Sequence, residues 1–266
     1  MLKTRILSAC VFVPLILIAT ILGGWFFAVL MLFVAIVGGY ELQRILAARE
    51  IRFQFPLFCG FTVLLFLCSL LSEYYESMSL IILFLLFALL AILFVFGKLR
   101  AVDAGLSFFG SVYIGLTLST MVVMRVQMEQ GIFLIFLVFI IQWLTDTGAY
   151  FVGSSLGRHK LMPKVSPKKS VEGAVGGIVV AVISALIFNA FTHILPWGWL
   201  ILVTVCASAL GQMGDLVESA FKRWAGVKDS GKIIPGHGGI LDRFDSLLFI
   251  APFLCYFLMI YTNLIQ

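Results

Sequence analysis

GIFLIFLVFIIQWLTDTGAYF, residues 131–151, contains a single charged side chain, that of Asp146. A helix that crosses a bilayer needs about 20 mainly apolar residues, because lipid offers its backbone no hydrogen-bond partners. This stretch has that length and that composition. It therefore predicts a membrane-spanning helix, and it is one of several such stretches.

Eight further apolar stretches are bounded by charged residues, glycine or proline: 5–22, 25–42, 55–72, 78–97, 105–124, 171–192, 197–221 and 244–263. Hydrophobic residues make up 62% of the chain, against roughly 45–50% in a soluble domain. We therefore expect an all-α, polytopic integral membrane protein with about nine transmembrane helices. Because only Gly23 and Gly24 separate the first two stretches, eight or ten helices are also compatible with the pattern.

The lysine and arginine residues predict the orientation, since short basic loops stay in the cytoplasm. With nine helices, 17 of the 18 basic residues fall on one side, and only Arg125 falls on the other. We therefore expect the protein to lie in the cell inner membrane with its N-terminus in the cytoplasm. The same arrangement explains the net charge of +5, so no nucleic-acid partner is predicted.

Polar residues are spread unevenly over what we expect to be a single membrane domain, residues 1–266. Residues 1–130 are predicted to be mainly packing helices. Seven of the thirteen acidic residues lie from Asp146 onward, where two predicted cytoplasmic segments are rich in Gly, Lys, Asp and Ser. Residues 131–266 are therefore predicted to be the catalytic half.

The segment GQMGDLVESAFKR, residues 211–223, ends one apolar stretch with several charges. Asp215, Glu218 and Lys222 are spaced i, i+3 and i+7, which places them on one face of a helix. A carboxylate inside a membrane is costly and therefore suggests a functional site. The alternative is that these acids reach a nearby interface and pair with Lys222 or Arg223.

Residues 224–239 form a glycine-rich cationic connection that contains KDSGK (228–232) and PGHGG (235–239). Such a loop can bring backbone N–H groups close to a phosphate while lysine neutralises its charge. An ordinary solvated turn has the same composition, so both interpretations stay open. The spacing of a Walker A loop is absent.

The next residues, ILDRFDS (240–246), place Asp242 and Asp245 three positions apart at the start of the last apolar stretch. Carboxylate oxygens at neighbouring helix ends suit Mg²⁺, which prefers a few carboxylates together with water and substrate phosphates. The alternative is helix capping by Asp242, and one carboxylate can do both.

Two earlier motifs are DTGAYFVG (146–153) and SPKKSVEG (166–173). Lys168, Lys169 and Ser170 directly precede a predicted helix start, where anions bind well. A pair of lysines that anchors the chain at the membrane interface is the alternative.

These motifs together resemble the signature of the phosphatidate cytidylyltransferases. The resemblance is carried by SAFKR (219–223), KDSG (228–231) and IPGHGGILDRFD (234–245), and by DTGAY (146–150) and SPKKSVEG, with Ser170 where threonine is more usual. It implies an Mg²⁺-dependent nucleotidyltransferase that converts CTP and phosphatidate to CDP-diacylglycerol and pyrophosphate for phospholipid biosynthesis. It also implies a multi-helix fold that forms a homodimer, and leaves open a second, monovalent cation.

The resemblance, joined to the chemistry of the residues, implies metal ligation by Asp215 and Asp242, with Glu218 and Asp245 as further ligands or orienting groups. The groups expected to bind the triphosphate or pyrophosphate are Lys222, Arg223, Lys228 and Arg243, while Lys168 and Lys169 are expected to bind CTP or the lipid phosphate. Asp146, Glu172 and His237 complete the expected substrate-binding set, and a structural role for His237 stays open. Because CTP arrives from the cytosol and phosphatidate from the inner leaflet, the active site is expected to face the cytoplasm.

Two other functions compete with this interpretation. A cation-coupled transporter could use Asp146 and Asp215 as an ion path, but the polar groups gather on one predicted side and no second repeat is visible. A CDP-alcohol phosphotransferase would carry a D-G-x-x-A-R motif, which is missing from the chain.

Overall fold

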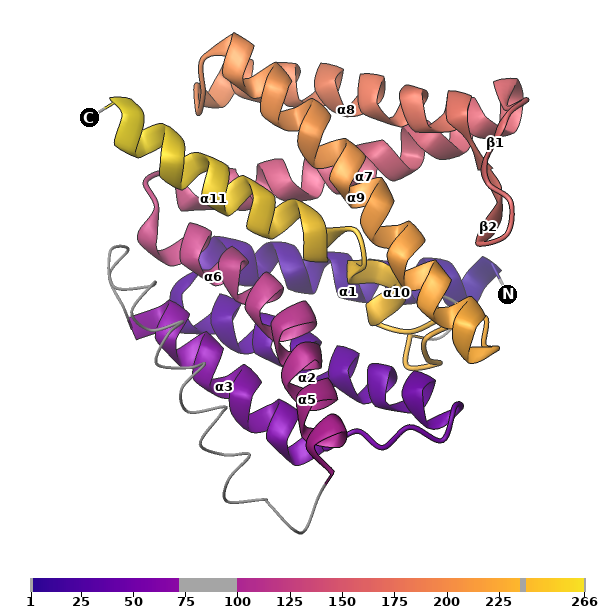
Figure 1. Cartoon of the computed structure of the whole chain (residues 1–266). Coiled ribbons are helices and arrows are strands. Elements are labelled where there is room, and N and C mark those ends of the chain that lie inside the picture. The colour runs from indigo at the N-terminus through magenta and orange to yellow at the C-terminus, as the bar shows by residue number, and fades with distance from the viewer. Residues whose placement is uncertain (1, 72–99, 235–237, 266) are drawn as a thin grey trace. The chain divides into compact units, whose positions relative to one another are not determined.

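The computed structural model describes residues 2–71, 100–234 and 238–265, and most of them are helical. The helices are α1 (Leu2–Leu22), α2 (Gly24–Ala47), α3 (Phe55–Leu71), α5 (Ala101–Gly110), η2 (Ser111–Leu116), α6 (Thr117–Gln127), α7 (Gly131–Leu156), α8 (Val171–Thr192), α9 (Trp197–Ala225), α10 (Leu241–Phe244) and α11 (Leu247–Ile265) (Figure 1). Between α7 and α8 lie the strands β1 (Lys160–Met162) and β2 (Ser166–Ser170).

Six of the described helical segments are long and apolar enough to cross a membrane: Gly24–Ala47, Val102–Gln127, Gly131–Leu156, Val171–Thr192, Trp197–Ala225 and Leu247–Leu264. Cys10–Leu22 and Phe55–Leu71 are shorter apolar helices. The helical, multi-pass character expected from composition is confirmed. The stretch 78–97 lies outside the described residues, so the count of nine spans and the cytoplasmic N-terminus remain predictions.

The predicted helix 105–124 is present, but its middle forms a π-helix, η2, between α5 and α6. The Ser111 hydroxyl donates to the carbonyl oxygens of Ser107 at 2.9 Å and Phe58 at 3.3 Å. A Cβ at Gly115 would lie 2.9 Å from Thr62 Oγ1, so this turn packs very closely on α3. Hydropathy alone does not reveal such a local widening.

The described chain divides into two compact units. The first contains Met1–Glu129 and Trp224–Arg243, and the second contains Gln130–Arg223 and Phe244–Gln266. In the first unit, α2 packs on α3, and Phe27, Met31 and Phe58 of these helices are fully buried. The glycine-rich segment that follows α9 thus belongs with helices to which the sequence assigned only packing.

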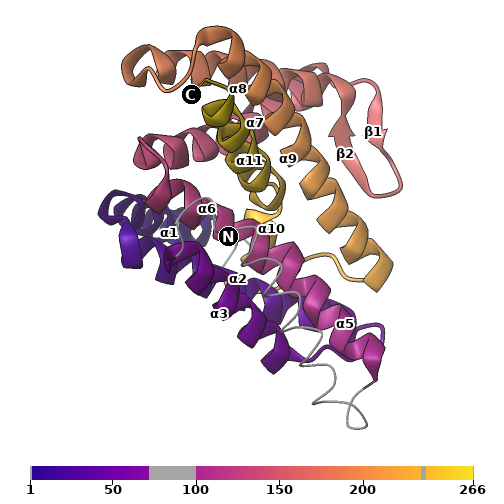
Figure 2. The same cartoon turned by 60° about the vertical axis from the view of Figure 1, so that its left-hand side comes forward.

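In the second unit, α7 and α8 lie side by side (Figures 1 and 2). The buried stripe of α8 recurs every four residues and is made of small side chains: Gly173, Gly177, Ala181, Ala185 and Asn189. A Cβ at Gly177 would lie only 2.6 Å from the Thr145 carbonyl oxygen. Small residues allow such close helix packing where no water drives association, and the exposed opposite stripe, which includes Ile187 and Phe191, suits lipid.

The antiparallel hairpin β1–β2 was not predicted (Figure 2). Its second strand reads SPKKS, which lacks the alternation of apolar and polar residues that marks a strand. The predicted helix start after it is confirmed, because Ser170 caps α8 and its Oγ accepts a hydrogen bond from Gly173 N at 3.1 Å. The hairpin therefore positions Lys168 and Lys169 immediately before α8.

Candidate active site

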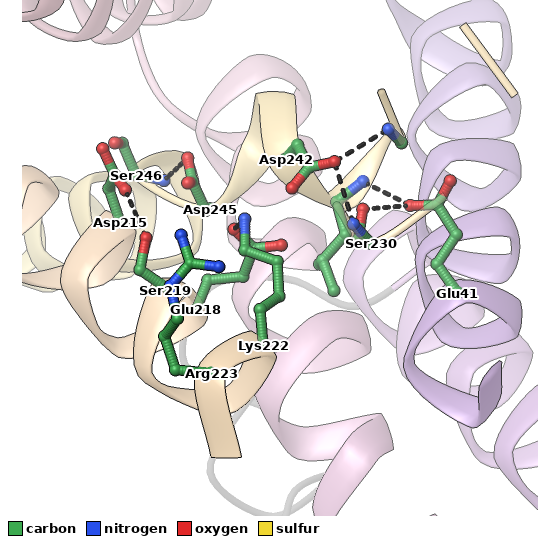
Figure 3. Close-up of polar contacts among 12 residues, drawn as sticks. Glu41, Asp215, Glu218, Ser219, Lys222, Arg223, Ser230, Asp242, Asp245 and Ser246 are labelled. Carbon is green, nitrogen blue, oxygen red and sulfur yellow. Dashed lines mark hydrogen bonds and ion pairs between the residues drawn. The ribbon is translucent and has the colours of Figure 1, made fainter. Parts of the chain in front are cut away.

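The inner face of α9 carries the acid and base predicted to share it (Figure 3). Glu218 is 1% exposed and Lys222 is 8% exposed, and Lys222 Nζ donates to Glu218 Oε2 at 2.5 Å. The pairing that the sequence offered as an alternative is therefore present, but it lies in the interior of the protein. A buried ion pair is strongly destabilised when one partner is removed.

Two glycines of α9 bring α11 close to this face. A Cβ at Gly211 would lie 2.6 Å from Ile250 Cδ1, and one at Gly214 would lie 2.7 Å from the carbonyl oxygen of Asp245. Asp245 consequently enters the same buried region, where its Oδ1 accepts a hydrogen bond from Ser246 N at 2.6 Å.

The carboxyl group of Asp245 lies among other negative charges. Burial raises the pKa of Asp245 well above its ordinary value of 3.8, and the negative charges of Asp215, Glu218 and Asp146 raise it further, against the lowering effect of the Ser246 N–H. Acids from three separate motifs of the sequence thus influence one another within the second unit. Their electrostatic potential favours the binding of cations.

Lys169 of β2 supplies one such cation, with its Nζ 2.5 Å from Asp215 Oδ2. Asp215 Oδ1 also accepts a hydrogen bond from Ser219 Oγ at 3.2 Å (Figure 3). Lys168, by contrast, is exposed. The hairpin therefore places one of the two predicted lysines on the acid cluster.

Three other predicted site residues belong to this unit. Glu172 and Arg223 form hydrogen bonds with backbone groups near the hairpin, and Asp146 lies on α7. Glu172 accepts hydrogen bonds from the N–H groups of Arg158 and His159 and pairs with His159 Nδ1 at 2.6 Å. Arg223 Nε donates to the Val165 carbonyl oxygen at 3.3 Å. Asp146 is exposed near the middle of α7.

In the first unit, Asp242 is held by the segment that precedes it. Its Oδ2 accepts hydrogen bonds from Gly239 N at 2.8 Å and Ser230 N at 3.0 Å. The helix that begins beside Asp242 is only the single turn α10. Asp242 is the second residue of this turn, and the two N–H groups precede the helix, so these bonds hold the preceding segment and are not the helix N-capping that the sequence offered as the alternative.

Glu41 of α2 also contacts the segment before Asp242, and the sequence did not predict this role. It is fully buried, and its carboxylate accepts hydrogen bonds from Ser230 Oγ at 3.0 Å, Ile240 N at 3.0 Å and Leu241 N at 2.8 Å (Figure 3). Two backbone N–H groups of the glycine-rich connection 224–239, those of Ser230 and Gly239, face the Asp242 carboxylate rather than open solvent. For Glu41, the available signal was a lone acid in an apolar helix, which suggests a specific role.

The remaining predicted phosphate-binding residues of this segment, Lys228 and Arg243, are exposed. His237 lies outside the described residues. Within residues 2–71, 100–234 and 238–265, no three acidic, histidine or cysteine side chains are grouped closely enough to hold a metal ion. The ammonium groups of Lys169 and Lys222 contact the carboxylates instead.

Comparison with known proteins identifies the family. Residues 3–261 match the model of the cytidylyltransferase family. The chain belongs to this family. The match covers both units, so Asp215, Glu218, Asp245 and the Glu41 contacts all lie within the matched region.

Relatives of this cytidylyltransferase-family chain occur in several bacteria. The chain is similar to a phosphatidate cytidylyltransferase of Bacillus subtilis (strain 168), with 37% identity over 98% of each sequence. It is also similar to phosphatidate cytidylyltransferases of Staphylococcus epidermidis (strain ATCC 12228 / FDA PCI 1200) and Staphylococcus aureus (strain COL), each 47% identical over 127 residues, which cover 47% of this chain and 49% of the relative.

Proposed function

We infer that this protein is a phosphatidate cytidylyltransferase, which transfers the cytidylyl group of CTP to phosphatidate and releases pyrophosphate. The observation that carries this inference is the similarity to the Bacillus subtilis phosphatidate cytidylyltransferase along 98% of both chains. The acid and lysine cluster of the second unit supports it, because phosphoryl-type transfer depends mainly on positioning and charge stabilisation.

In the proposed reaction, a phosphate oxygen of phosphatidate forms a bond to the α-phosphorus of CTP. The bond from that phosphorus to the oxygen that bridges to the β-phosphate breaks, and pyrophosphate leaves with the electron pair. Phosphatidate is already ionised near neutral pH, so the protein needs no general base. The residues act instead by binding the phosphates and stabilising their charge.

Lys169 suits this task, since an ammonium group has three hydrogen-bond donors and the side chain is partly exposed. Its contact with Asp215 at 2.5 Å holds the nitrogen in place. Lys222 is buried against Glu218, and we propose that it contributes through its positive charge. The exposed Lys168, Arg223, Lys228 and Arg243 are proposed to attract the triphosphate and phosphatidate. Asp146, Glu172 and His237 remain substrate-binding candidates on the sequence alone.

We propose Mg²⁺ as the cofactor, with Asp215, Glu218 and Asp245 as its candidate ligands, because carboxylate oxygens are the hard donors that this ion prefers. In the described positions these three carboxylates are not grouped closely enough to hold the ion together, so one or two of them would bind it along with water and substrate phosphates. In the described positions Lys169 and Lys222 neutralise two of the three acids, so the metal would compete with these lysines. A bound Mg²⁺ would neutralise charge on the phosphates. Asp242, which belongs to the other unit, is a candidate metal ligand on the sequence alone. A second, monovalent cation also rests on the sequence alone.

The proposed location is the bacterial inner membrane, with the active site facing the cytoplasm. This follows from the apolar helices and from the basic residues on one predicted side. Cysteine labelling tests it: a probe that cannot cross the membrane should label Glu129→Cys in intact spheroplasts and Lys164→Cys only after permeabilisation. The homodimer is also a prediction, to be measured as the mass of the solubilised protein by light scattering.

The decisive experiment follows radiolabelled CTP into a chloroform-soluble product, using purified protein in detergent with phosphatidate and Mg²⁺. Product should require phosphatidate, should not form with diacylglycerol, and should vanish with EDTA and return with added Mg²⁺. Asp215→Asn should fold and fail to form product. Absence of product from the unmodified protein with either CTP or dCTP would refute the proposed function.

A further inference from the structure

The buried carboxylate of Glu41 takes no part in the chemistry above, although it contacts the segment that leads to Asp242. It lies near the end of α2, is 0% exposed, and accepts from Ser230 Oγ, Ile240 N and Leu241 N at 2.8–3.0 Å. Both carboxylate oxygens are used. Within the described part of the chain, every hydrogen bond to this carboxylate comes from that one segment.

Two glycines of the segment lie against Glu41. A Cβ at Gly231 would clash with Glu41 Oε1, and a Cβ at Gly239 would clash with Glu41 Oε2. Real Cβ atoms do not approach oxygen so closely, so any larger residue would displace the carboxylate or the segment. The glycine content that suggested a phosphate loop is, at these two positions, explained by a buried side chain of the same protein.

Ser230 connects Glu41 to Asp242. Its Oγ donates to Glu41 Oε2 and its backbone N–H donates to Asp242 Oδ2, both at 3.0 Å (Figure 3). Gly239, which abuts Glu41, donates its N–H to the same Asp242 oxygen at 2.8 Å. Ser230 and Gly239 therefore both lie against Glu41 and donate to Asp242.

A buried carboxylate is costly unless donors surround it, and packing alone would be served by an apolar residue. We propose that Glu41 is a positioning residue: by binding Ser230, Ile240 and Leu241 it holds residues 230 and 239–241 so that the Asp242 carboxylate keeps one orientation. The expected loss of activity without Glu41 rests on the proposed function. The expected loosening of the residues that Glu41 binds does not.

Glu41→Gln in the full-length protein tests this directly. Glutamine replaces an acceptor oxygen with an NH₂ donor, which then faces an N–H or hydroxyl donor of the segment. We expect kcat/KM for CTP to fall about 10- to 100-fold, the range found for groups that orient a metal ligand, and the Mg²⁺ concentration for half-maximal activity to rise. Hydrogen exchange of the Ile240 and Leu241 amides should accelerate while that of α3 stays unchanged.

Asp103→Asn is the matched control, since Asp103 is another buried acid of the same unit and pairs with Arg100, away from the segment. It should lower the thermal unfolding temperature without changing the exchange of Ile240 and Leu241 or the Mg²⁺ dependence. Ser230→Ala should show a weaker form of the Glu41→Gln effect, because it keeps the N–H bond to Asp242. Gly231→Ala should reproduce the effect with the Glu41 charge intact, and it replaces Glu41→Gln if that variant fails to fold.

Normal exchange and normal Mg²⁺ dependence in Glu41→Gln, or in Gly231→Ala in its place, would overturn the inference. The inference would also be overturned if Asp103→Asn lost as much kcat/KM as Glu41→Gln at the same loss of thermal stability. If the unmodified protein makes no cytidylyl product, the proposed function fails, and the exchange measurement still decides whether Glu41 holds the segment.

Discussion

Lys169 Nζ lies 2.5 Å from Asp215 Oδ2, so the second strand of the β1–β2 hairpin is joined to α9 by an ion pair. Both side chains are partly exposed, at 27% and 30%. The pair is therefore accessible to a charged substrate, unlike the buried Glu218–Lys222 pair. Partial exposure also means that its contribution to stability is small, which makes it a good site for testing catalysis.

Lys169→Ala should reduce kcat about 10²- to 10³-fold, the usual loss when a group that stabilises transition-state charge is removed. Its unfolding temperature should stay close to that of the unmodified protein. Lys168→Ala is the matched control, since it removes the adjacent, exposed lysine of the same strand, and it should have a much smaller effect on kcat. Equal losses in the two variants would contradict a specific role for Lys169.

Glu218→Gln and Lys222→Met should each destabilise the protein by about 3–5 kcal/mol, because each leaves a buried charge without its partner. The double variant should recover much of this loss, since both charges are then gone. Thermal unfolding in detergent, followed by circular dichroism, measures all three. Additive destabilisation in the double variant would show that the two groups are not coupled.

The raised pKa of Asp245 predicts a pH dependence of stability in the absence of divalent cations. Between about 3.8, the ordinary value, and the raised folded-state value, the unfolded chain releases the proton while the folded protein retains it. Stability should therefore fall as pH rises through this interval and level off above it. Asp245→Asn should remove this component of the slope, as unfolding measured at a series of pH values would show; an unchanged slope would assign it to other groups.

Gly177→Ala should destabilise the α7–α8 packing, because its Cβ would lie 2.6 Å from the Thr145 carbonyl oxygen. We expect a loss of about 1–3 kcal/mol, as for other overpacked sites. Gly198→Ala introduces the same methyl group at the start of α9, where no atom lies within 4 Å, and should leave the unfolding temperature unchanged or slightly higher. A similar loss in both variants would point to a general effect of removing helical glycine.

The sequence predicted the helical elements well, because the length of an apolar run and the period of a helix are local properties. The stretch 131–151 lies within α7, Gly131–Leu156, and the stretch 171–192 coincides with α8. Asp215, Glu218 and Lys222 occupy one region of α9 as expected from their spacing. The hairpin β1–β2 was missed, because a strand of the composition SPKKS has no periodic pattern.

What the sequence determined by itself is the membrane character, the helices and the family motifs, since each depends on residues close together in the chain. Only the tertiary structure decided which charges meet. It brings Lys169 rather than Lys168 to Asp215, Asp245 to the acids of α9 through the close approach at Gly211 and Gly214, and Glu41 to Ser230, Ile240 and Leu241. The physical reason is that a buried charge needs a partner, and that partner is supplied by packing between segments far apart in the sequence, which no local pattern records.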